Sequence, residues 1–554
     1  DIPVYIKETK GLTRNNESIS FGIPFKEGLI YNPHELSLFD QDKELLNNII
    51  TTAYWPDKSI KWAFVNSQVC IQKNSKSTLQ LKRINKRSTR AVGVNIKEEN
   101  HAYIISTGRD EFTLYKDSLI PLPTNYVISD EKNKKRAEII LKTQKNDTFK
   151  IKVSSTSVEN EGLNSTVLFK GTFVNENIED EKLPLIFESR ITFYANKSLV
   201  KWQFTIANPN AAQHSGGKWD LGDLGSHYFT DLSIELPLNS SAEVNYKLQW
   251  NEKLSQVIEG KLSIFQCSSG GENWFSNNHV NKCGEMPLNF KGYQVCNGHE
   301  KVSCGERASP YVFVNDNDIH LGINIANFWQ NFPKAITIEQ NKLRLSLFPH
   351  ESDDAFELQA GEQKTHHIHF DFSTTHEDLI GVTNPLELSF SPLYLSETNA
   401  IHWLCGNVDD NALIKLIIDN GLNGKNNFFN KREVIDEFGW RNFGEVYADH
   451  ESLGHEGETP LISHYNNQYD PILGFARMYL QTGEQRWFEL MNDLAQHVVD
   501  IDIYNTDSDR HEYNRGLFWH TDHYLDAETC THRTFSKHHK AVYQDHTGGG
   551  GPGL

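Results

Sequence analysis

The sequence predicts a multidomain protein with β-sheets over about its first 375 residues and α-helices from about residue 410 onward. In the first part, apolar and polar residues alternate in many short runs that are bounded by turn residues, as is typical of half-buried strands. After residue 410 the apolar residues recur at helical spacing. The 554 residues are enough for two to four domains, each with its own hydrophobic core.

The first expected unit is a small β domain at residues 1–85. Alternating or apolar runs at 18–25 and 36–39 predict strands, and the turn sequence at 56–59 leads into an alternating run at 60–65. The basic segment 82–88 that follows has the composition of a linker. We therefore expect the first domain to end near residue 85.

The second expected unit is a large β-sandwich at residues 86–385. Short runs at 151–153, 166–170 and 199–204 alternate or are apolar, and such runs continue to about residue 375. Many short strands at irregular spacing are typical of a sandwich. A long, turn-rich insertion at 270–305 is expected to form a loop that reaches over another part of the molecule.

The third expected unit is helical and begins at residue 386. Helical spacing is present at 411–421, 459–481 and 484–501. The second and third helices are joined only by residues 482–483, so they should pack against each other in antiparallel directions. Helical hairpins of this kind build α/α toroids. Three or four helices are too few to close one, so we expect residues 386–554 to hold the start of a truncated toroid.

The charge of the chain restricts its partners. A net charge of -19 argues against a general nucleic-acid binder, because phosphate contacts need Lys and Arg. No apolar run approaches the roughly 20 residues of a membrane span, so no membrane insertion is expected. An acidic polysaccharide would need a local basic or His-rich pocket. Histidine supplies one candidate, because 11 of the 24 His lie between His450 and His546.

The start of the sequence and its cysteines together suggest an oxidising compartment. The chain starts at Asp1 without a signal-peptide segment, which fits a processed protein that is secreted or periplasmic. Cys283, Cys296 and Cys304 are close in sequence, so one disulfide is expected among them. The sequence has no CxxC pair, which argues against a zinc ribbon.

The stretch from Asp436 to Gln481 concentrates polar and aromatic residues ahead of the apolar part of a helix. A helix that lines a cavity would explain this pattern. A buried helix whose polar groups are satisfied by its neighbours is the alternative. The polar residues of the expected helix are His464, Tyr465, Asn466, Asn467, Gln468, Tyr469 and Asp470.

Three segments of the sequence resemble a known family. They are WPDKSIKW at 55–62, SHYNNQYD at 463–470, and RGLFWHTDHY at 515–524 followed by THRT at 531–534. Together and in this order they resemble the exo-rhamnogalacturonan lyase and ulvan lyase group, the YetA-like family of polysaccharide lyases. The resemblance covers essentially the whole chain. It implies a small β-barrel at 1–85, a β-sandwich at 86–385 and an α/α toroid from 386, and it implies a polymer of rhamnose and uronate as substrate.

A polysaccharide lyase of this kind cleaves by β-elimination, which needs three groups. A base removes the C5 proton of the uronate, an acid protonates the leaving oxygen, and a cation or amide neutralises the carboxylate. His464 is the predicted base, because it lies at a helix start, where the dipole keeps imidazole neutral. Tyr465 or Tyr469 is the predicted acid. The predicted neutralising groups are Asn467 and either Arg441 or Arg515.

Other residues of the same region are predicted to contact the sugar. His520 and His523, with Asp522 between them, could also ligate zinc, but sugar binding is the preferred interpretation. No cofactor is required, although the sequence allows a bound divalent cation. The predicted substrate-binding residues are Trp440, Arg441, His455, Trp519, His520, His523, Tyr524 and Arg533.

Two other functions stay open at this point. A glycoside hydrolase would use paired carboxylates from the set Glu445, Glu456, Glu458, Asp470 and Asp522. A glycan-binding protein without activity would use Trp440, Trp487 and Trp519 as stacking platforms. Within the lyase hypothesis, the acidic composition rich in Asn and Lys favours ulvan over rhamnogalacturonan, and the sequence leaves endo or exo action and the oligomeric state open.

Overall fold

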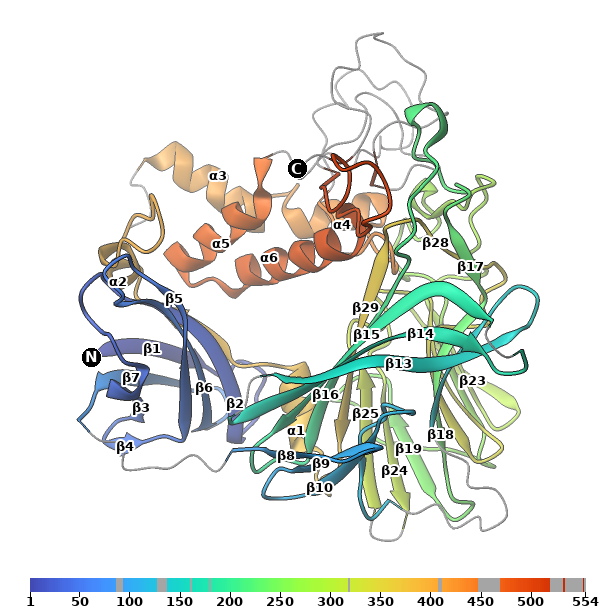
Figure 1. Cartoon of the computed structure of the whole chain (residues 1–554), viewed down its shortest axis with the longest axis horizontal. Helices are drawn as coiled ribbons and strands as arrows, with labels where there is room; N and C mark the ends of the chain where they lie inside the picture. The colour runs from blue at the N-terminus through green and yellow to red at the C-terminus, as the bar shows by residue number, and fades with distance from the viewer. Residues whose placement is uncertain are drawn as a thin grey trace.

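The computed structural model describes residues 1–85, 93–126, 137–159, 162–178, 181–316, 319–406, 411–446 and 469–518, together with 532, 533 and 552. A small β-barrel, a large β-sheet region and a layer of helices make up the described chain (Figure 1). The barrel and the large sheet lie side by side, and the helices lie across both. The described residues are thus mostly β, and the α-helices among them lie after residue 376.

The barrel consists of two sheets around one hydrophobic core. Inward residues alternate along β1, which buries Ile2, Val4 and Ile6. β7 extends to Arg83, so the basic segment expected to be a linker begins inside a strand. In order of pairing, the first sheet contains β30 (Glu387–Phe390), β1 (Ile2–Lys7), β7 (Lys76–Arg83), β3 (Leu36–Asp40) and β4 (Lys43–Glu44), and the second contains β2 (Arg14–Pro24), β6 (Ile60–Ile71) and β5 (Asn47–Tyr54).

The turn predicted at 56–59 is present between β5 and β6. The backbone N–H of Trp55 donates to the carbonyl of Ser59 at 2.8 Å, and the Asp57 carboxylate accepts from the backbone N–H of Ser59 at 2.9 Å. The indole Nε1 of Trp55 donates to the carbonyl of Phe25 at 2.9 Å. This segment therefore holds the β5–β6 turn against the residue that follows β2.

A buried ion pair ties the barrel to the chain that follows the large sheet. Arg14 donates to the Glu8 carboxylate at 3.0 Å and to the carbonyl of Asn384 at 2.7 Å. Burial alone would raise the pKa of Glu8, but hydrogen bonds from the backbone of Asn74 and from Arg14 outweigh it and lower the pKa from 4.5 to about 2.

This carboxylate gives a pH-dependent contribution to stability. Because the folded-state pKa of Glu8 lies below the unfolded value, its contribution is complete above about pH 4.5 and is lost as the pH falls to about 2. We expect the Glu8→Gln variant to have a lower free energy of unfolding than wild type near neutral pH, and the difference should shrink on acidification. Denaturant unfolding of both proteins at several pH values measures it. A difference that does not change with pH would contradict the assignment.

The central region is one hydrogen-bonded sheet of 16 strands that surrounds the main hydrophobic core. The sequence prediction of a β-rich middle region is confirmed. The pairing order is β20 (Ser255–Gln256), β19 (Glu243–Lys247), β24 (Tyr311–Asp316), β25 (Ile319–Ile325), β29 (Gln363–Asp371), β16 (Leu199–Ala207), β15 (Lys182–Tyr194), β14 (Asn164–Asn175), β13 (Thr148–Glu159), β12 (Glu138–Lys142), β18 (Asp231–Pro237), β27 (Lys342–Phe348), β26 (Lys334–Glu339), β21 (Leu262–Gln266), β22 (Tyr293–Asn297) and β23 (Glu300–Gly305).

Two smaller sheets accompany it. One contains β11 (Leu122–Pro123), β10 (Glu111–Tyr115), β9 (Ala102–Ser106) and β8 (Asn95–Glu98), and the other pairs β17 (His227–Phe229) with β28 (Phe356–Leu358). Short 3-10 helices are η1 (Pro33–Glu35), η2 (Ser215–Gly217) and η3 (Asn277–His279). The second small sheet and η3 both border a pocket.

The disulfide expected among Cys283, Cys296 and Cys304 is wrong, because all three are free cysteines. The strand register gives the reason for the pair on β22 and β23. Cys296 lies opposite Lys301, and Cys304 lies opposite Gln294, so the two cysteines are offset along the ladder.

Apart from β30, helices replace strands after β29 in the described residues, as the sequence predicts. The helices are α1 (Glu377–Thr383), α2 (Pro392–Glu397), α3 (Ala412–Asn423), α4 (Phe428–Ile435), α5 (Pro471–Thr482) and α6 (Gln485–His497), which continues into a π-helical turn, η6 (Val498–Asp502). None of the helices in the described ranges combines the length and the apolar character that a membrane crossing requires. The α/α toroid stays a prediction.

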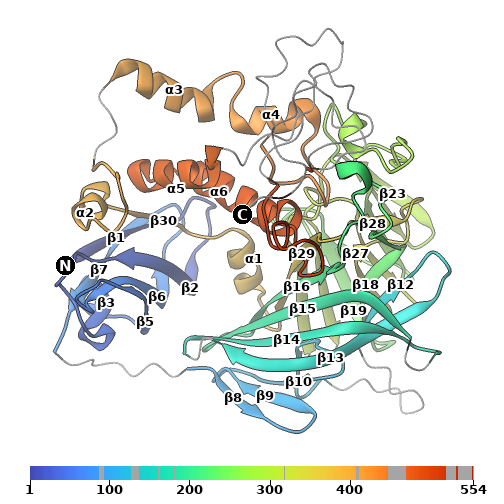
Figure 2. The ribbon, with the colours of Figure 1, turned by 45° about the horizontal axis from the view of Figure 1, so that its top comes forward.

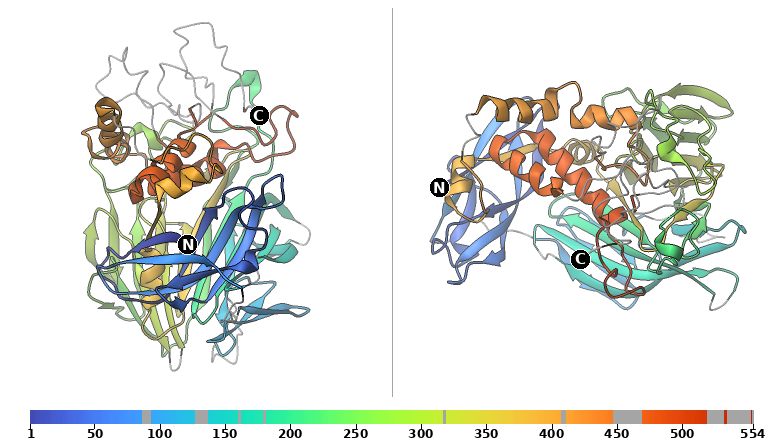
Figure 3. Two further views of the ribbon diagram at one scale, coloured as in Figure 1. Left: turned by 90° about the vertical axis from the view of Figure 1, so that its left-hand side faces the viewer. Right: turned by 90° about the horizontal axis from the view of Figure 1, so that it is seen from above.

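The helices bridge the barrel and the large sheet, as Figures 2 and 3 show for α5 and α6. The Tyr479 hydroxyl of α5 donates to the carbonyl of Leu388 in β30. At the other end, the Asp500 carboxylate of η6 accepts from the backbone N–H of Thr365 in β29 at 3.0 Å. Between these two anchors, Trp487, Leu490 and Leu494 of α6 pack with Phe475 of α5 in a separate small core.

The predicted start of the second helix at Thr459 is wrong for α5, which begins at Pro471. Asp470 is its N-cap, with φ 48° and with its carboxylate accepting from the N–H of Leu473 at 3.2 Å. A left-handed residue at this place cannot belong to the helix. Tyr469 therefore precedes α5 and does not share a helical face with the residues after it.

Candidate active site

A pocket of about 240 Å³ lies where the insertion 270–305, the large sheet and the segment after α4 meet. The insertion was expected to reach over another part of the molecule, and residues 278–289 of it border this pocket. Its polar, charged and aromatic lining includes Tyr228, Asn278, His279, Lys282, Glu357, Trp440, Arg441 and Asn442.

The segment 439–442 is held against the loop between β25 and β26 by backbone hydrogen bonds. The N–H of Gly439 donates to the carbonyl of Gln330 at 2.7 Å, and the N–H of Trp440 donates to the carbonyl of Phe332 at 2.9 Å. Gly439 has φ 92°, and a Cβ there would lie 3.2 Å from the Phe332 ring. Because this segment packs closely against Phe332, its backbone forms a well-fixed wall of the pocket.

The pocket contains a histidine that a buried carboxylate orients. Nε2 of His279 lies 2.7 Å from Oδ2 of Asp436, which is fully buried and whose Oδ1 also accepts from the hydroxyl of Ser269. If Nε2 donates to the carboxylate, Nδ1 is the basic nitrogen of the ring. The pair thus has the components of a general base and its orienting group.

A tyrosine and a lysine lie beside each other in the same pocket. Lys282 is exposed, and its Nζ lies 4.1 Å from the ring centre of Tyr228. Burial, and after it the charge of Glu357, raise the pKa of the Tyr228 phenol well above its usual value of 10. This phenol therefore stays protonated and can donate its proton, while Lys282 supplies positive charge.

Trp440 and Arg441 are the two predicted substrate-binding residues that the structure places in the pocket wall. Trp440 is 9% exposed and packs edge-on against Phe348, with ring centres 5.1 Å apart. The Arg441 guanidinium stacks on Trp440 at 4.3 Å and pairs with the buried carboxylate of Glu362 at 3.3 Å. Because Glu362 already balances its charge, Arg441 fits a positioning role better than the predicted neutralising role.

Three other predicted residues lie away from this pocket. Tyr469 is 74% exposed, and Arg515 pairs with exposed Asp507, with Nε 3.0 Å from the carboxylate. Arg533 is buried, donates to the carbonyl of Ala360 at 2.8 Å and stacks on Tyr504 and Phe518. The predicted catalytic residues His464, Tyr465 and Asn467 lie outside the described residues, and so do the predicted substrate-binding residues His455, Trp519, His520, His523 and Tyr524.

Of the carboxylates considered for a hydrolase, the two described ones do not line the pocket. Asp470 caps α5, and Glu445 is 1% exposed and belongs to a separate buried cluster. Glu456, Glu458 and Asp522 lie outside the described residues. Trp487, considered as a stacking platform, is buried in the small core between α5 and α6.

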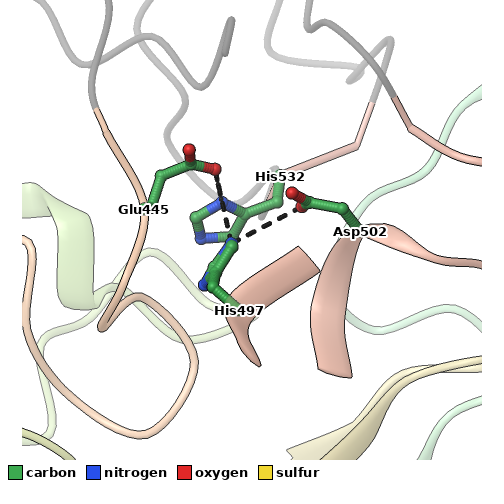
Figure 4. A group of neighbouring side chains, drawn as sticks. All are labelled: Glu445, His497, Asp502 and His532. Carbon is green, nitrogen blue, oxygen red and sulfur yellow. Dashed lines mark hydrogen bonds and ion pairs between the residues drawn. The ribbon is translucent and has the colours of Figure 1, made fainter. Parts of the chain in front are cut away.

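The buried cluster contains Glu445, His497, Asp502 and His532, whose ligand atoms all lie within 4.8 Å of one another (Figure 4). Nε2 of His497 is 3.3 Å from Oε2 of Glu445 and 3.5 Å from Oδ1 of Asp502. Nδ1 of His532 is 3.0 Å from the same Glu445 oxygen. Two imidazoles and two carboxylates at such distances could hold a divalent cation. The sequence allows such a cation, but it does not indicate these four residues as its ligands.

The cluster strongly favours positive charge at its centre. Burial opposes the charged form of His497, but the carboxylates of Asp502 and Glu445 outweigh it and raise its pKa to about 10. Burial would also raise the pKa of Glu445, yet His497 and His532 hold it well below its usual value. Burial and then His497 lower the pKa of His532 to about 4.

Gly444, next to Glu445, has a conformation that only glycine adopts easily. Its φ is 105°, and a Cβ there would lie 2.3 Å from the carbonyl oxygen of Asp493 and 2.9 Å from the Cβ of His497. We expect Gly444→Ala to lower the free energy of unfolding by about 1–3 kcal/mol or more, since backbone strain and a clash combine. Denaturant unfolding measures the change.

The matched control is Gly474→Ala in α5. A Cβ there has nothing within 4 Å, so alanine should raise the free energy of unfolding by up to about 1 kcal/mol through helix propensity. Equal effects of the two substitutions would contradict the described backbone at Gly444.

The chain has two informative matches among known sequences. Residues 5–82 match the family described as the PcRGLX-like N-terminal RIFT barrel domain. The protein YetA of Bacillus subtilis (strain 168), itself described as uncharacterized, is 20% identical over an alignment that covers 90% of this chain and 66% of YetA. Both matches agree with the resemblance to the YetA-like group that the sequence segments carry. The chain spans a little under two-thirds of the length of this relative.

Similarity to solved structures is weaker. An alpha-mannosidase from Enterococcus faecalis V583 gives a TM-score of 0.38 at 10% identity, over 70% of this chain and 46% of that one. A galactose mutarotase-like protein from Clostridium acetobutylicum gives 0.26 at 8% identity, over 50% of this chain and 98% of that one.

Proposed function

We propose that the protein is a polysaccharide lyase that cleaves an acidic polysaccharide of rhamnose and uronate by β-elimination. The observation that carries the proposal is the match of residues 5–82 to a domain named after a rhamnogalacturonan lyase, within a similarity to YetA that extends over 90% of the chain. The matches support a protein that acts on polysaccharides. The lyase reaction, a preference for ulvan, a secreted or periplasmic location and a toroidal helical domain belong to the proposal.

The pocket offers a group for each requirement of the reaction. His279 would remove the C5 proton of the uronate, the C4=C5 bond would form as the C4–O bond breaks, and Tyr228 would protonate the departing oxygen. Lys282 would neutralise the uronate carboxylate, which acidifies the C5 proton. Asp436 would keep the His279 ring in one orientation.

The residues predicted from the sequence provide a second assignment of the same roles. In it, His464 is the base, Tyr465 is the acid and Asn467 contacts the carboxylate, and all three lie outside the described residues. The two assignments share the reaction and the substrate, and they differ in which histidine is essential. Substitutions can therefore separate them without changing the proposed function.

The decisive test incubates the protein with ulvan, with rhamnogalacturonan I and with a neutral galactan, while near-ultraviolet absorbance and new reducing ends are followed. A lyase acting on a uronate polymer produces both signals, because the new C4=C5 bond is conjugated with the carboxylate. Reducing ends without absorbance would instead indicate a hydrolase. Binding without either signal would indicate a glycan-binding protein, and activity on the galactan alone would overturn the uronate substrate.

A further inference from the structure

The buried cluster joins four side chains from separate parts of the chain. Glu445 follows the segment after α4, His497 ends α6, Asp502 ends η6, and His532 comes from the C-terminal part of the chain. All four side chains are at most 2% exposed (Figure 4). Burying two carboxylates costs several kcal/mol each unless positive charge lies next to them.

The hydrogen bonds of Asn442 determine how the His532 ring is protonated. Nδ2 of Asn442 donates to the carbonyl of Asn278 at 2.9 Å, so its Oδ1 is the atom that faces Nε2 of His532, also at 2.9 Å. Nε2 must therefore carry a proton. In the neutral ring, Nδ1 then directs its lone pair toward Oε2 of Glu445, 3.0 Å away.

Two electron-rich atoms in such contact repel each other unless a cation lies between or beside them. Nε2 of His497 faces both carboxylates, and neither of its ring nitrogens makes a well-aligned hydrogen bond within the described residues, so either a proton on this ring or a metal ion in its place supplies the positive charge. The His532 arrangement, with one nitrogen bonded to an amide oxygen and the other aimed at the cluster, is what metal-bound histidines usually show.

Two of the three ion-pair distances in the cluster fit a small ion with four ligands. The third, 3.0 Å between Nδ1 of His532 and Oε2 of Glu445, is shorter, and all the ligand atoms lie within 4.8 Å of one another, so the side chains would adjust slightly on binding. Ligand atoms about 2.0–2.2 Å from zinc in a tetrahedron lie about 3.3–3.6 Å apart. His497 Nε2 lies 3.3 Å from Glu445 Oε2 and 3.5 Å from Asp502 Oδ1. With the ion in place of the proton on His497, two neutral imidazoles and two carboxylates carry a charge of about -2, which a divalent ion balances. Calcium and magnesium prefer six or more oxygen ligands, so the nitrogen donors favour a transition metal.

We propose that Glu445, His497, Asp502 and His532 form a closed, four-coordinate site for a divalent transition-metal ion, with zinc as the best-suited ion. Four protein ligands in a buried site are typical of a structural role. The ion would fasten the ends of α6 and η6 to the segment after α4. Asn442 bonds His532 and also lines the pocket, so the site would stabilise the pocket wall from behind.

The test uses the full chain and needs no substrate, so its outcome is independent of the proposed lyase activity. The protein is stripped with a strong chelator, then loaded with Zn²⁺ or Co²⁺, and bound metal is measured after dialysis. We expect about one zinc per chain, a higher Tm for the loaded protein than for the stripped protein, and the intense visible absorption of four-coordinate Co²⁺. Loaded wild type that holds no metal after dialysis, or whose Tm does not change, would overturn the proposal.

Substitutions locate the ion. His497→Ala should abolish the stoichiometric zinc and the Co²⁺ absorption, whereas His299→Ala, at a histidine that is 72% exposed, should retain both. Asp502→Asn preserves the size of the side chain, so it is the alternative test of the site if His497→Ala does not fold. It should weaken zinc binding by at least about 10-fold through loss of a ligand charge. Equal zinc affinity in wild type, Asp502→Asn and His299→Ala would place the ion elsewhere and overturn the assignment.

Discussion

The His279→Ala variant is expected to lose about 10²- to 10⁴-fold in the rate of β-elimination, which is the usual contribution of a general base. The reason is geometric, because His279 lines the pocket and Asp436, 2.7 Å from its Nε2, leaves Nδ1 as the basic nitrogen. Affinity for the polymer should change little, since the other pocket residues stay. Initial rates of near-ultraviolet absorbance, together with binding measurements, separate the two effects.

The control is His299→Ala, which removes an exposed histidine of the same insertion and should leave the rate unchanged. Partial recovery of His279→Ala by added imidazole would identify the missing group as a base. His464→Ala, His520→Ala and His523→Ala test the residues predicted from the sequence. A nearly normal rate in His279→Ala together with an inactive His464→Ala would transfer the base to the second assignment.

The Tyr228→Phe variant is expected to lose a similar factor, about 10²- to 10⁴-fold, through the absence of a proton donor for the leaving oxygen. Burial and the nearby charge of Glu357 keep this phenol protonated, which is the state that a general acid needs. The aromatic ring beside Lys282 is retained in phenylalanine. We therefore expect kcat to fall while KM stays nearly constant.

A substrate with a good leaving group distinguishes an acid from a structural tyrosine. In a synthetic uronate with a nitrophenyl group on its C4 oxygen, the leaving nitrophenolate departs without protonation. Tyr228→Phe should therefore cleave this substrate nearly as fast as wild type. Tyr54→Phe, at a barrel tyrosine that is 58% exposed, is the matched control and should behave as wild type on both substrates. Equal losses on the natural and the synthetic substrate would rule out Tyr228 as the acid.

Regular structure was predictable from the sequence because its signal is local. The alternation along β2, in the run predicted at 18–25, and the helical spacing of α6 are both local patterns of about a dozen residues. The start of α5 was not predictable in this way, because Asp470 takes a left-handed conformation that the neighbouring residues do not indicate. The strand register that separates Cys296 from Cys304 is likewise a property of pairing and not of spacing.

The candidate site was predictable only in part for the same reason. Trp440 and Arg441 were found from the polar segment after α4, and they line the pocket. His279 was missed because its partner Asp436 is 157 residues away, so no motif joins them. The turn-rich insertion that carries His279 and Lys282 was the available signal. The sequence indicated Glu445 only as a possible member of a carboxylate pair. Its cluster with His497 and His532 was missed, because the three residues come from separate segments of the chain.

The position of β30 in the barrel has a consequence for the order in which the chain can mature during synthesis. β30 pairs with β1 along residues 4–7, and Arg14 bonds the carbonyl of Asn384, so the barrel is completed by chain that the ribosome makes about 300 residues after β7. Until then the outer edge of β1 has no neighbouring strand and is open to pairing with another nascent chain. The barrel and the large sheet are therefore interleaved rather than consecutive, and cutting the gene after residue 85 would remove a strand from the barrel.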